Sequence, residues 1–239
     1  MYDIAATTSV GLVREGNEDC VSINGRRALE GDVLRDSVET GGVVALVADG
    51  MGGHARGEIA SNTVLHKLEQ SIGSTLEPHD IFPAIRTANR AVYDLASSNP
   101  EYRGMGATLV GVLINKSNCT YFNVGDSRAY RWRKGVLQQL STDHVPAFPP
   151  GHARSHAVSQ SLGGAPYFRE VIPAVGSFEL HIGDRVMLCS DGLTDVLDES
   201  EIGTVLSSGS PERCVTQLLD QVLSEGAPDN VTIVVIARS

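Results

Sequence analysis

The sequence predicts an α+β protein whose core consists mainly of β-strands. Strands are indicated by short apolar runs that are rich in β-branched residues and bounded by Gly or Asp. These runs cover residues 43–48, 109–114, 186–189 and 231–236. Further strand-like pieces cover residues 119–124, 128–133, 169–175 and 184–189. The strands are grouped together with helical patterns before and after them, which favours separate layers of helix and sheet over a repeating strand–helix–strand unit.

Three segments have the apolar spacing of amphipathic helices. Apolar residues recur on one helical face in residues 60–72, and again in residues 82–95. The third helix is predicted to start at Ser210 and Pro211, which suit the N-cap and first-turn positions, and to end before Gly226. Each helix would place an apolar stripe on a sheet.

The composition is that of a globular protein, and it predicts a single domain over residues 1–239. Hydrophobic residues make up 41% of the chain and charged residues 20%, which is enough to bury a sizeable core. The formal net charge is -10, from 29 acidic and 19 basic residues. This charge argues against nonspecific binding to nucleic acid or to anionic membranes, and it makes a bound cation plausible.

The cysteines and the N-terminus predict a cytosolic protein without a membrane segment. Cys20, Cys119, Cys189 and Cys214 are widely spaced and form no CxxC pair, so we interpret them as reduced thiols in the core. The first 19 residues lack a basic segment followed by an apolar one, and no run reaches about 18 consecutive apolar residues.

Four aspartates adjoin the ends of predicted strands: Asp49, Asp126, Asp191 and Asp229. Buried carboxylates are costly unless they are paired or bound to a metal, and no nearby cluster of Lys or Arg could neutralise all four. Oxygen ligands favour Mg²⁺ or Mn²⁺ over zinc. A single Asp-Gly pair is more often only a turn, so the prediction depends on the four acids together with Glu18, Asp19 and the glycine-rich turn at residues 49–54.

Short motifs carry a family resemblance along nearly the whole chain. In order they are Arg14-x-x-Asn17-Glu18-Asp19, Asp49-Gly50-Met51-Gly52-Gly53, Gly106-Ala107-Thr108, Gly125-Asp126-Ser127-Arg128, Asp143-His144, Leu162-Gly163, Ser190-Asp191-Gly192-Leu193 and Asp229-Asn230-Val231-Thr232. This ordered set resembles the metal-dependent serine/threonine phosphatases of the protein phosphatase 2C kind (PPM), in their compact bacterial form. The resemblance implies a four-layer αββα sandwich, in which helix pairs flank two antiparallel sheets and a dinuclear metal centre lies at one edge.

The resemblance also implies a role for each acid. Asp49 would bridge two Mn²⁺ or Mg²⁺ ions, Asp191 and Asp229 would complete one metal site, and the Gly50 carbonyl would serve the other. Two further acids, Glu18 and Asp19, would hold metal-bound waters, and Asp126 would bind a third, weaker metal. Taken alone, Glu18 and Asp19 would read as a solvated loop and Asp126 as a tight turn.

The chemistry that such a centre supports is hydrolysis of a phosphate monoester. Two cations about 3.5–4 Å apart neutralise the phosphoryl oxygens and lower the pKa of a shared water, so that a bridging hydroxide can attack in line. Arg14 is the predicted phosphate clamp, because a guanidinium binds two phosphoryl oxygens. His54 could be the general acid, or it could steady the Gly52-Gly53 turn; the eukaryotic pattern has histidine where this chain has Met51.

The segment at residues 141–166 departs from the family pattern, which usually has a longer flap there. It is short and rich in proline and histidine, and we expect a long loop. We interpret His144 as structural, and His152 and His156 as surface residues, because no third zinc ligand lies nearby.

The predicted function is removal of phosphate from phosphoserine and phosphothreonine in proteins, including substrates of a cognate Ser/Thr kinase, by a monomeric enzyme. Two alternatives remain open. The same fold could be a catalytically silent module that binds phosphoproteins or a kinase, and the motifs equally allow a small phosphorylated metabolite as substrate.

Overall fold

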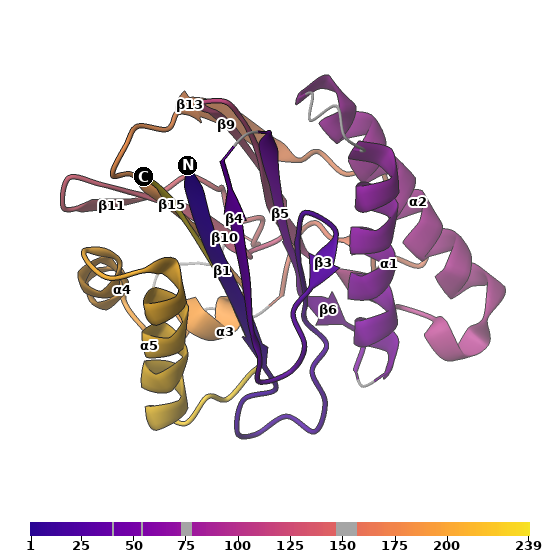
Figure 1. Ribbon diagram of the computed structural model, residues 1–239. Helices are drawn as coiled ribbons and strands as arrows, with labels where there is room; N and C mark the ends of the chain where they lie inside the picture. Colours follow the sequence, from indigo (N-terminus) through magenta and orange to yellow (C-terminus); the bar gives the residue numbers. More distant parts are fainter. Residues whose placement is uncertain (40, 54, 73–77, 147–156) are drawn as a thin grey trace.

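The computed structural model describes residues 1–39, 41–53, 55–72, 78–146 and 157–239 of the chain. Two six-stranded sheets lie face to face, and every pair of neighbouring strands in them is antiparallel. One group of helices covers the outer face of each sheet, with α4 and α5 on the left of Figure 1 and α1 and α2 on the right. The predicted α+β class and the four-layer αββα sandwich are therefore confirmed.

The first sheet has the strand order β11-β10-β14-β15-β1-β4 and contains the strands nearest both termini. Its strands are β1 (Tyr2–Ser9), β4 (Val33–Val38), β10 (Arg128–Arg133), β11 (Val136–Gln139), β14 (Arg185–Cys189) and β15 (Val231–Arg238). The second sheet has the order β13-β9-β8-β5-β2-β3. Its strands are β2 (Cys20–Ile23), β3 (Arg26–Arg27), β5 (Gly42–Ala48), β8 (Leu109–Asn115), β9 (Asn118–Val124) and β13 (Ala174–Glu179).

Three two-residue strands form a small third sheet, and they are β6 (Gly50–Met51), β7 (Gly106–Ala107) and β12 (Leu162–Gly163). The α-helices are α1 (Ala55–Ile72), α2 (Ile81–Ser98), α3 (Asp191–Thr194), α4 (Glu199–Leu206) and α5 (Pro211–Ser224). Two 3₁₀ turns, Pro78–Asp80 and Pro100–Tyr102, flank α2.

Alternation of side chains along each strand divides the core into three layers. In β14, Val186 and Leu188 pack between the two sheets, whereas Met187 and Cys189 face the layer that includes α4 and α5. Likewise Val112 in β8 faces the other sheet. Both faces of these strands are covered, which is why their sequences are continuous apolar runs.

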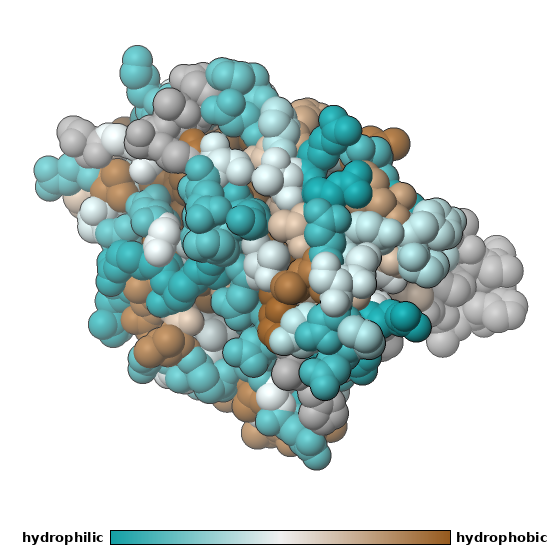
Figure 2. Space-filling model, turned by 90° about the vertical axis from the view of Figure 1, so that its right-hand side faces the viewer, coloured by the Kyte–Doolittle hydropathy of each residue, from teal (hydrophilic) through white to brown (hydrophobic). Residues whose placement is uncertain are grey.

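The helices form where the apolar spacing predicts them. The third predicted helix is α5, and the Ser210 hydroxyl accepts a hydrogen bond from the Arg213 N–H at 3.3 Å, as an N-cap does. On the opposite side of the molecule, the face that includes α1 and α2 is mainly hydrophilic, with hydrophobic side chains in small separate groups (Figure 2). The helices are therefore amphipathic, as predicted.

Two predictions from strand patterning were wrong in detail. The strand expected over residues 169–175 begins only at Ala174. Ile172 instead bonds through both backbone groups to the Gln160 side chain, at 2.8 and 3.3 Å, and Pro173 has no N–H to donate. Within the expected loop at residues 141–166, Leu162–Gly163 forms a short strand paired with β7.

All four cysteines are buried and free, as expected for reduced core thiols. Among the described residues, no helix has both the length and the apolar character needed to cross a bilayer.

Candidate active site

Strand register brings the predicted acids to one edge of the sandwich. Cys20 pairs with Ala48, which places Asp19 beside Asp49. In the first sheet, Arg128 pairs with Cys189, so the turn that carries Asp126 lies near Asp191. Strands β14 and β15 are antiparallel, so the end of β14 and the start of β15, where Asp191 and Asp229 lie, are adjacent. Residues far apart in the chain thus meet at the ends of their strands.

A cavity of about 450 Å³ lies at this edge. Seven of the nine predicted site residues line it: Arg14, Glu18, Asp49, Gly50, Asp126, Asp191 and Asp229. Asp19 is buried and is not part of the lining. His54, the ninth predicted residue, lies outside the described residues, as do His152 and His156.

Asp19 is held from one side only. Its Oδ2 accepts a hydrogen bond from the Ser190 hydroxyl at 2.7 Å, and the same hydroxyl accepts one from the Thr232 N–H at 3.0 Å. The other carboxylate oxygen, Oδ1, is buried and has no hydrogen-bond partner within the described part of the chain. A buried carboxylate oxygen without a partner is unfavourable, and a cation or a cation-bound water would satisfy it.

The backbone of Asp49 is fixed by Thr108. The Asp49 N–H donates to the Thr108 hydroxyl oxygen at 3.1 Å, and the Thr108 N–H donates to the Asp49 carbonyl at 2.8 Å. A further bond of 2.7 Å joins the hydroxyls of Thr108 and Ser127. Asp49 therefore enters the cavity from a rigid support next to the turn that carries Asp126.

Glu18 packs against the first turn of α1, where only glycine fits. A Cβ on Gly57 would lie 1.9 Å from Oε2 of Glu18, and a Cβ on Gly50 would lie 2.2 Å from the Gly57 carbonyl oxygen. The carboxylate of Glu18 thus lies near the N-terminal end of a helix, where the helix dipole favours negative charge.

Arg14 extends from the loop between β1 and β2 and forms an ion pair with Asp229. One of its guanidinium nitrogens lies 2.6 Å from Oδ2 of Asp229. The hydrogen bond with Asp229 raises the pKa of Arg14 further, so the guanidinium stays charged. The predicted phosphate clamp and a predicted metal ligand are therefore in direct contact.

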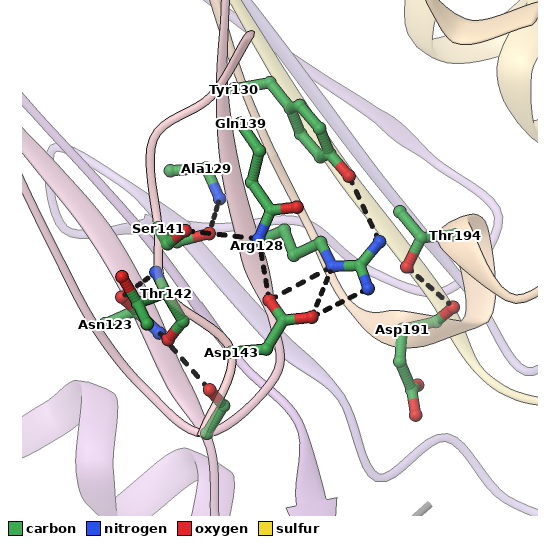
Figure 3. A network of polar contacts seen from close by, with 11 residues as sticks. Asn123, Arg128, Ala129, Tyr130, Gln139, Ser141, Thr142, Asp143, Asp191 and Thr194 are labelled. Atoms are coloured by element: carbon green, nitrogen blue, oxygen red, sulfur yellow. Dashed lines mark hydrogen bonds and ion pairs between the residues drawn. The ribbon is translucent and has the colours of Figure 1, made fainter. Parts of the chain in front are cut away.

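Beside the cavity, Arg128 forms a second ion pair. Its Nε and Nη2 donate to Oδ2 of Asp143 at 3.0 and 2.7 Å, and its Nη1 donates to the Tyr130 hydroxyl at 3.2 Å (Figure 3). Gln139 also donates to Asp143, at 2.8 Å. In the same view the carboxylate of Asp191 is directed away from Thr194, whose hydroxyl bonds to the Asp191 backbone carbonyl at 3.4 Å. Asp143 therefore neutralises Arg128 next to the acids that line the cavity.

Burial and mutual repulsion raise the pKa values of these acids. Burial raises the pKa of Asp191 to about 8, and the neighbouring charges of Asp126 and Asp195 add to the effect. Burial also raises the pKa of Asp49 well above its usual range, with further contributions from Asp19 and Asp191. For Asp19, burial raises the pKa to about 6 although hydroxyl hydrogen bonds oppose it. Without a cation, the cluster is thus an unfavourable concentration of negative charge.

The chemistry of these groups fits hard divalent cations. The lining offers carboxylate and carbonyl oxygens, and Asp19, beside Asp49, has a buried Oδ1 with no hydrogen-bond partner among the described residues. Across the described ranges, however, no three acidic, histidine or cysteine side chains come close enough together to hold one ion by themselves. The acids surround a cavity instead, so waters and the Gly50 carbonyl would have to complete the coordination, as Mg²⁺ commonly requires.

His144 has the structural role that was expected. Its ring Nδ1 accepts a hydrogen bond from the Gly125 N–H at 3.1 Å, and the backbone N–H of His144 donates to the Gly125 carbonyl at 2.9 Å. Burial lowers the pKa of His144, which favours the neutral ring that can accept this bond.

Several residues that support the site were not predicted from the sequence. The Ser190 hydroxyl bonds to Asp19, the Thr232 N–H bonds to that hydroxyl, and Gly57 leaves room for the Glu18 carboxylate. The motifs that include Thr108, Ser190 and Thr232 were visible in the sequence, but their partners are not readable from spacing. Gly57 had no such signal, because a single glycine in a helical pattern is uninformative about close contacts.

The sandwich, with its acidic cavity at one edge, has the architecture that the family resemblance implied. Residues 26–229 match the family model described as protein phosphatase 2C, and the chain therefore belongs to that family. The predicted resemblance is confirmed.

Individual relatives agree with this assignment. Over 244 residues the chain is 33% identical to the serine/threonine protein phosphatase PstP of Mycobacterium tuberculosis, a match that covers 97% of this chain and 44% of PstP, so the chain spans less than half the length of that relative. It is 29% identical to protein phosphatase PhpP of Streptococcus pneumoniae, over 99% of this chain and 98% of PhpP. A crystal structure of the PstP catalytic domain in complex with two manganese ions superposes with a TM-score of 0.80 at 30% identity, and the match covers 99% of both chains.

Proposed function

We propose that residues 1–239 form one catalytic domain that removes phosphate from phosphoserine and phosphothreonine in proteins. The observation that supports this most strongly is the convergence of five acids from separate strand ends on one cavity, with a guanidinium at its rim. The names of the relatives, which are serine/threonine phosphatases, support the same substrate class.

In this proposal two Mn²⁺ or Mg²⁺ ions bind in the cavity. Asp49 bridges them, Asp191 and Asp229 serve one ion, the Gly50 carbonyl serves the other, and Asp126 holds a third, weaker ion. Glu18 and Asp19 accept hydrogen bonds from waters in the coordination shell. The ions would supply positive charge to the phosphoryl oxygens and make a bound water acidic at neutral pH. The two manganese ions in the PstP catalytic domain support this number of ions.

The chain itself would bind and orient the phosphate. Arg14 can present two N–H donors to phosphoryl oxygens, and its contact with Asp229 holds the guanidinium at the edge of the acidic cluster. When the ester bond breaks, the seryl or threonyl oxygen must receive a proton. We assign this role to His54, since a histidine titrates in the working range of pH.

The cellular setting is a further part of the proposal. We place the protein in the cytoplasm as a monomer, with proteins phosphorylated by a cognate Ser/Thr kinase as its substrates, and without nucleic-acid or membrane partners. Four free, buried thiols and a net charge of -10 support this setting.

The test is hydrolysis of a phosphothreonine peptide with Mn²⁺, with Mg²⁺ and with EDTA. We expect turnover with either metal and none with EDTA, and Asp49→Asn should be inactive under all conditions. A panel of sugar phosphates tests the small-metabolite alternative, and faster hydrolysis of these would overturn the protein substrate class. A protein that binds divalent metal but hydrolyses neither substrate would be a silent binding module.

A further inference from the structure

The side chain of Asn230 connects three parts of the site. Asn230 is buried and lies between Asp229 and the start of β15. Its Nδ2 donates to the carbonyls of Val10 and Gly16, each at 3.0 Å, and its Oδ1 accepts from the Glu18 N–H at 2.9 Å. Its own N–H donates to Oδ1 of Asp229 at 2.8 Å. Both amide donors and one acceptor position are therefore used within the site.

These bonds hold both ends of the segment at residues 10–18, which we call the Arg14 loop. Within the loop, Leu12 and Val13 are 64% and 67% exposed, so hydrophobic packing contributes little to its conformation. The Leu12 N–H donates to the Ala227 carbonyl at 2.9 Å, which is a second polar attachment to the same side of the site. The position of Arg14 thus depends mainly on polar bonds. Asn230 bonds to residues that precede Arg14 in the chain and to residues that follow it.

The backbone that carries Asn230 has little room to move. A Cβ on Gly11 would lie 2.3 Å from the Asp229 carbonyl oxygen, and a Cβ on Gly192 would lie 2.0 Å from the Asn230 carbonyl oxygen. Residues 229–230 are therefore held between two glycines, one in the Arg14 loop and one in α3. Because the anchor is fixed, the bonds from Asn230 hold the loop against the Asp229 side of the site, in addition to the bonds that Val10 and Asn17 make to Glu30.

We propose that Asn230 is a positioning residue that fixes Arg14 relative to Asp229 and thereby sets the affinity of the site for phosphate. Asn230 would act through Arg14 and would not touch the phosphate. This inference rests on the proposed function for its kinetic consequence, but the ordering of the loop can be measured independently of turnover.

A double-mutant cycle on the Mn²⁺-loaded chain tests the coupling. Asn230→Ala removes all three side-chain bonds, and we expect KM for the phosphothreonine peptide to rise about tenfold, with a smaller change in kcat. In Arg14→Ala the loop no longer carries the clamp, so adding Asn230→Ala should raise KM no further. Additive effects of the two substitutions, or an unchanged KM in Asn230→Ala, would overturn the proposal.

Hydrogen exchange tests the ordering of the loop without any substrate. Amides in residues 10–18, in particular those of Leu12 and Glu18, should exchange faster in Asn230→Ala than in the wild type. Asn230→Asp is a second variant of nearly the same shape that can still accept from Glu18 but cannot donate to Val10 or Gly16, and it should loosen the same segment. Unchanged exchange of residues 10–18 in both variants would overturn the proposal.

Asn89 provides a matched control. It is also a buried asparagine that bridges two segments, since it donates to the Arg169 carbonyl at 2.7 Å and accepts from the Gly163 N–H at 2.9 Å. Asn89→Ala should leave exchange in residues 10–18 unchanged, and its effect on KM should add to that of Arg14→Ala. If the wild type hydrolyses no phosphoester, the proposed function fails, whereas faster exchange confined to the Asn230 variants would still support the positioning role.

Discussion

The guanidinium of Arg14 lies 2.6 Å from a carboxylate oxygen of Asp229, although 215 positions separate the two residues in the chain. The Arg14 side chain is 55% exposed, so the ion pair adds only about 0–1 kcal/mol to stability. Its importance is geometric, because it places a cation for phosphate beside a predicted ligand for metal.

Replacing Arg14 should therefore affect substrate binding more than folding. For Arg14→Ala we expect KM for a phosphopeptide to rise about tenfold or more, with a smaller change in kcat and an unchanged melting temperature. Arg14→Lys keeps the charge but lacks the planar pair of donors, so its KM should lie between that of the wild type and that of Arg14→Ala. Steady-state kinetics and thermal unfolding measure both effects, and an unchanged KM in Arg14→Ala would remove this residue from the site.

Asp49→Asn should separate activity from the stability of the metal-free protein. The substitution removes the proposed bridging ligand, so activity should be lost and Mn²⁺ binding weakened. Because burial raises the pKa of Asp49, its charge destabilises the metal-free fold, and we expect the metal-free variant to melt a few degrees higher than the wild type. Calorimetry measures the Mn²⁺ affinity and the melting temperature of the metal-free variant, and phosphopeptide hydrolysis measures its activity. Full activity in this variant would contradict the bridging assignment.

The metal-free protein should lose stability as the pH rises from about 6.5 to 8. The folded-state pKa of Asp191 is raised to about 8, far above its unfolded value, so the folded state binds more protons than the unfolded state below that pH. Raising the pH removes this proton and lowers the free energy of unfolding, because the folded state then holds a buried charge. Bound Mn²⁺ should displace the proton and abolish the trend, and the net release of protons is measurable by calorimetry in buffers of different ionisation enthalpy. A metal-free melting temperature that rises over this range would contradict the pKa assignment.

Asp126→Ala should reduce activity while leaving the two main metal sites able to bind. Its carboxylate comes from the turn between β9 and β10 and is assigned to the third, weaker ion, not to the dinuclear pair. Titration with Mn²⁺ should show two ions in the variant, and phosphopeptide hydrolysis should require a higher Mn²⁺ concentration. Loss of all Mn²⁺ binding would instead place Asp126 in the dinuclear centre.

The ion pair of Arg128 with Asp143 should matter for folding. The two side chains are only 17% and 20% exposed, so Asp143→Ala would leave a largely buried guanidinium without its carboxylate. We expect a loss of about 2–4 kcal/mol in the free energy of unfolding. The exposed pair of Arg35 with Glu212 is the control, since Arg35→Ala should cause no measurable change. Chemical denaturation measures the free energy of unfolding of both variants. Equal losses in Asp143→Ala and Arg35→Ala would contradict a structural role for the Arg128–Asp143 pair.

Strands with continuous apolar runs were readable from the sequence, as were the mixed strands β9 and β10, but β1 was not. β5, β8, β14 and β15 are covered on both faces, and each leaves a recognisable run of apolar residues. β1 has the sequence YDIAATTS, and its small and polar residues gave no strand signal. It is nevertheless a central strand, because β15 and β4 pair with its two edges.

The sequence by itself determined the family, the layered fold and the acids of the candidate site, because those acids stand in ordered motifs next to apolar strands. Only the tertiary structure decided which groups support them: Ser190 beneath Asp19, Gly57 against Glu18, and Asn230 on both ends of the Arg14 loop. The physical reason is that each of these contacts joins residues distant in the chain through hydrogen bonds or close backbone approach. Such contacts depend on strand register, and local spacing in the sequence carries no record of them.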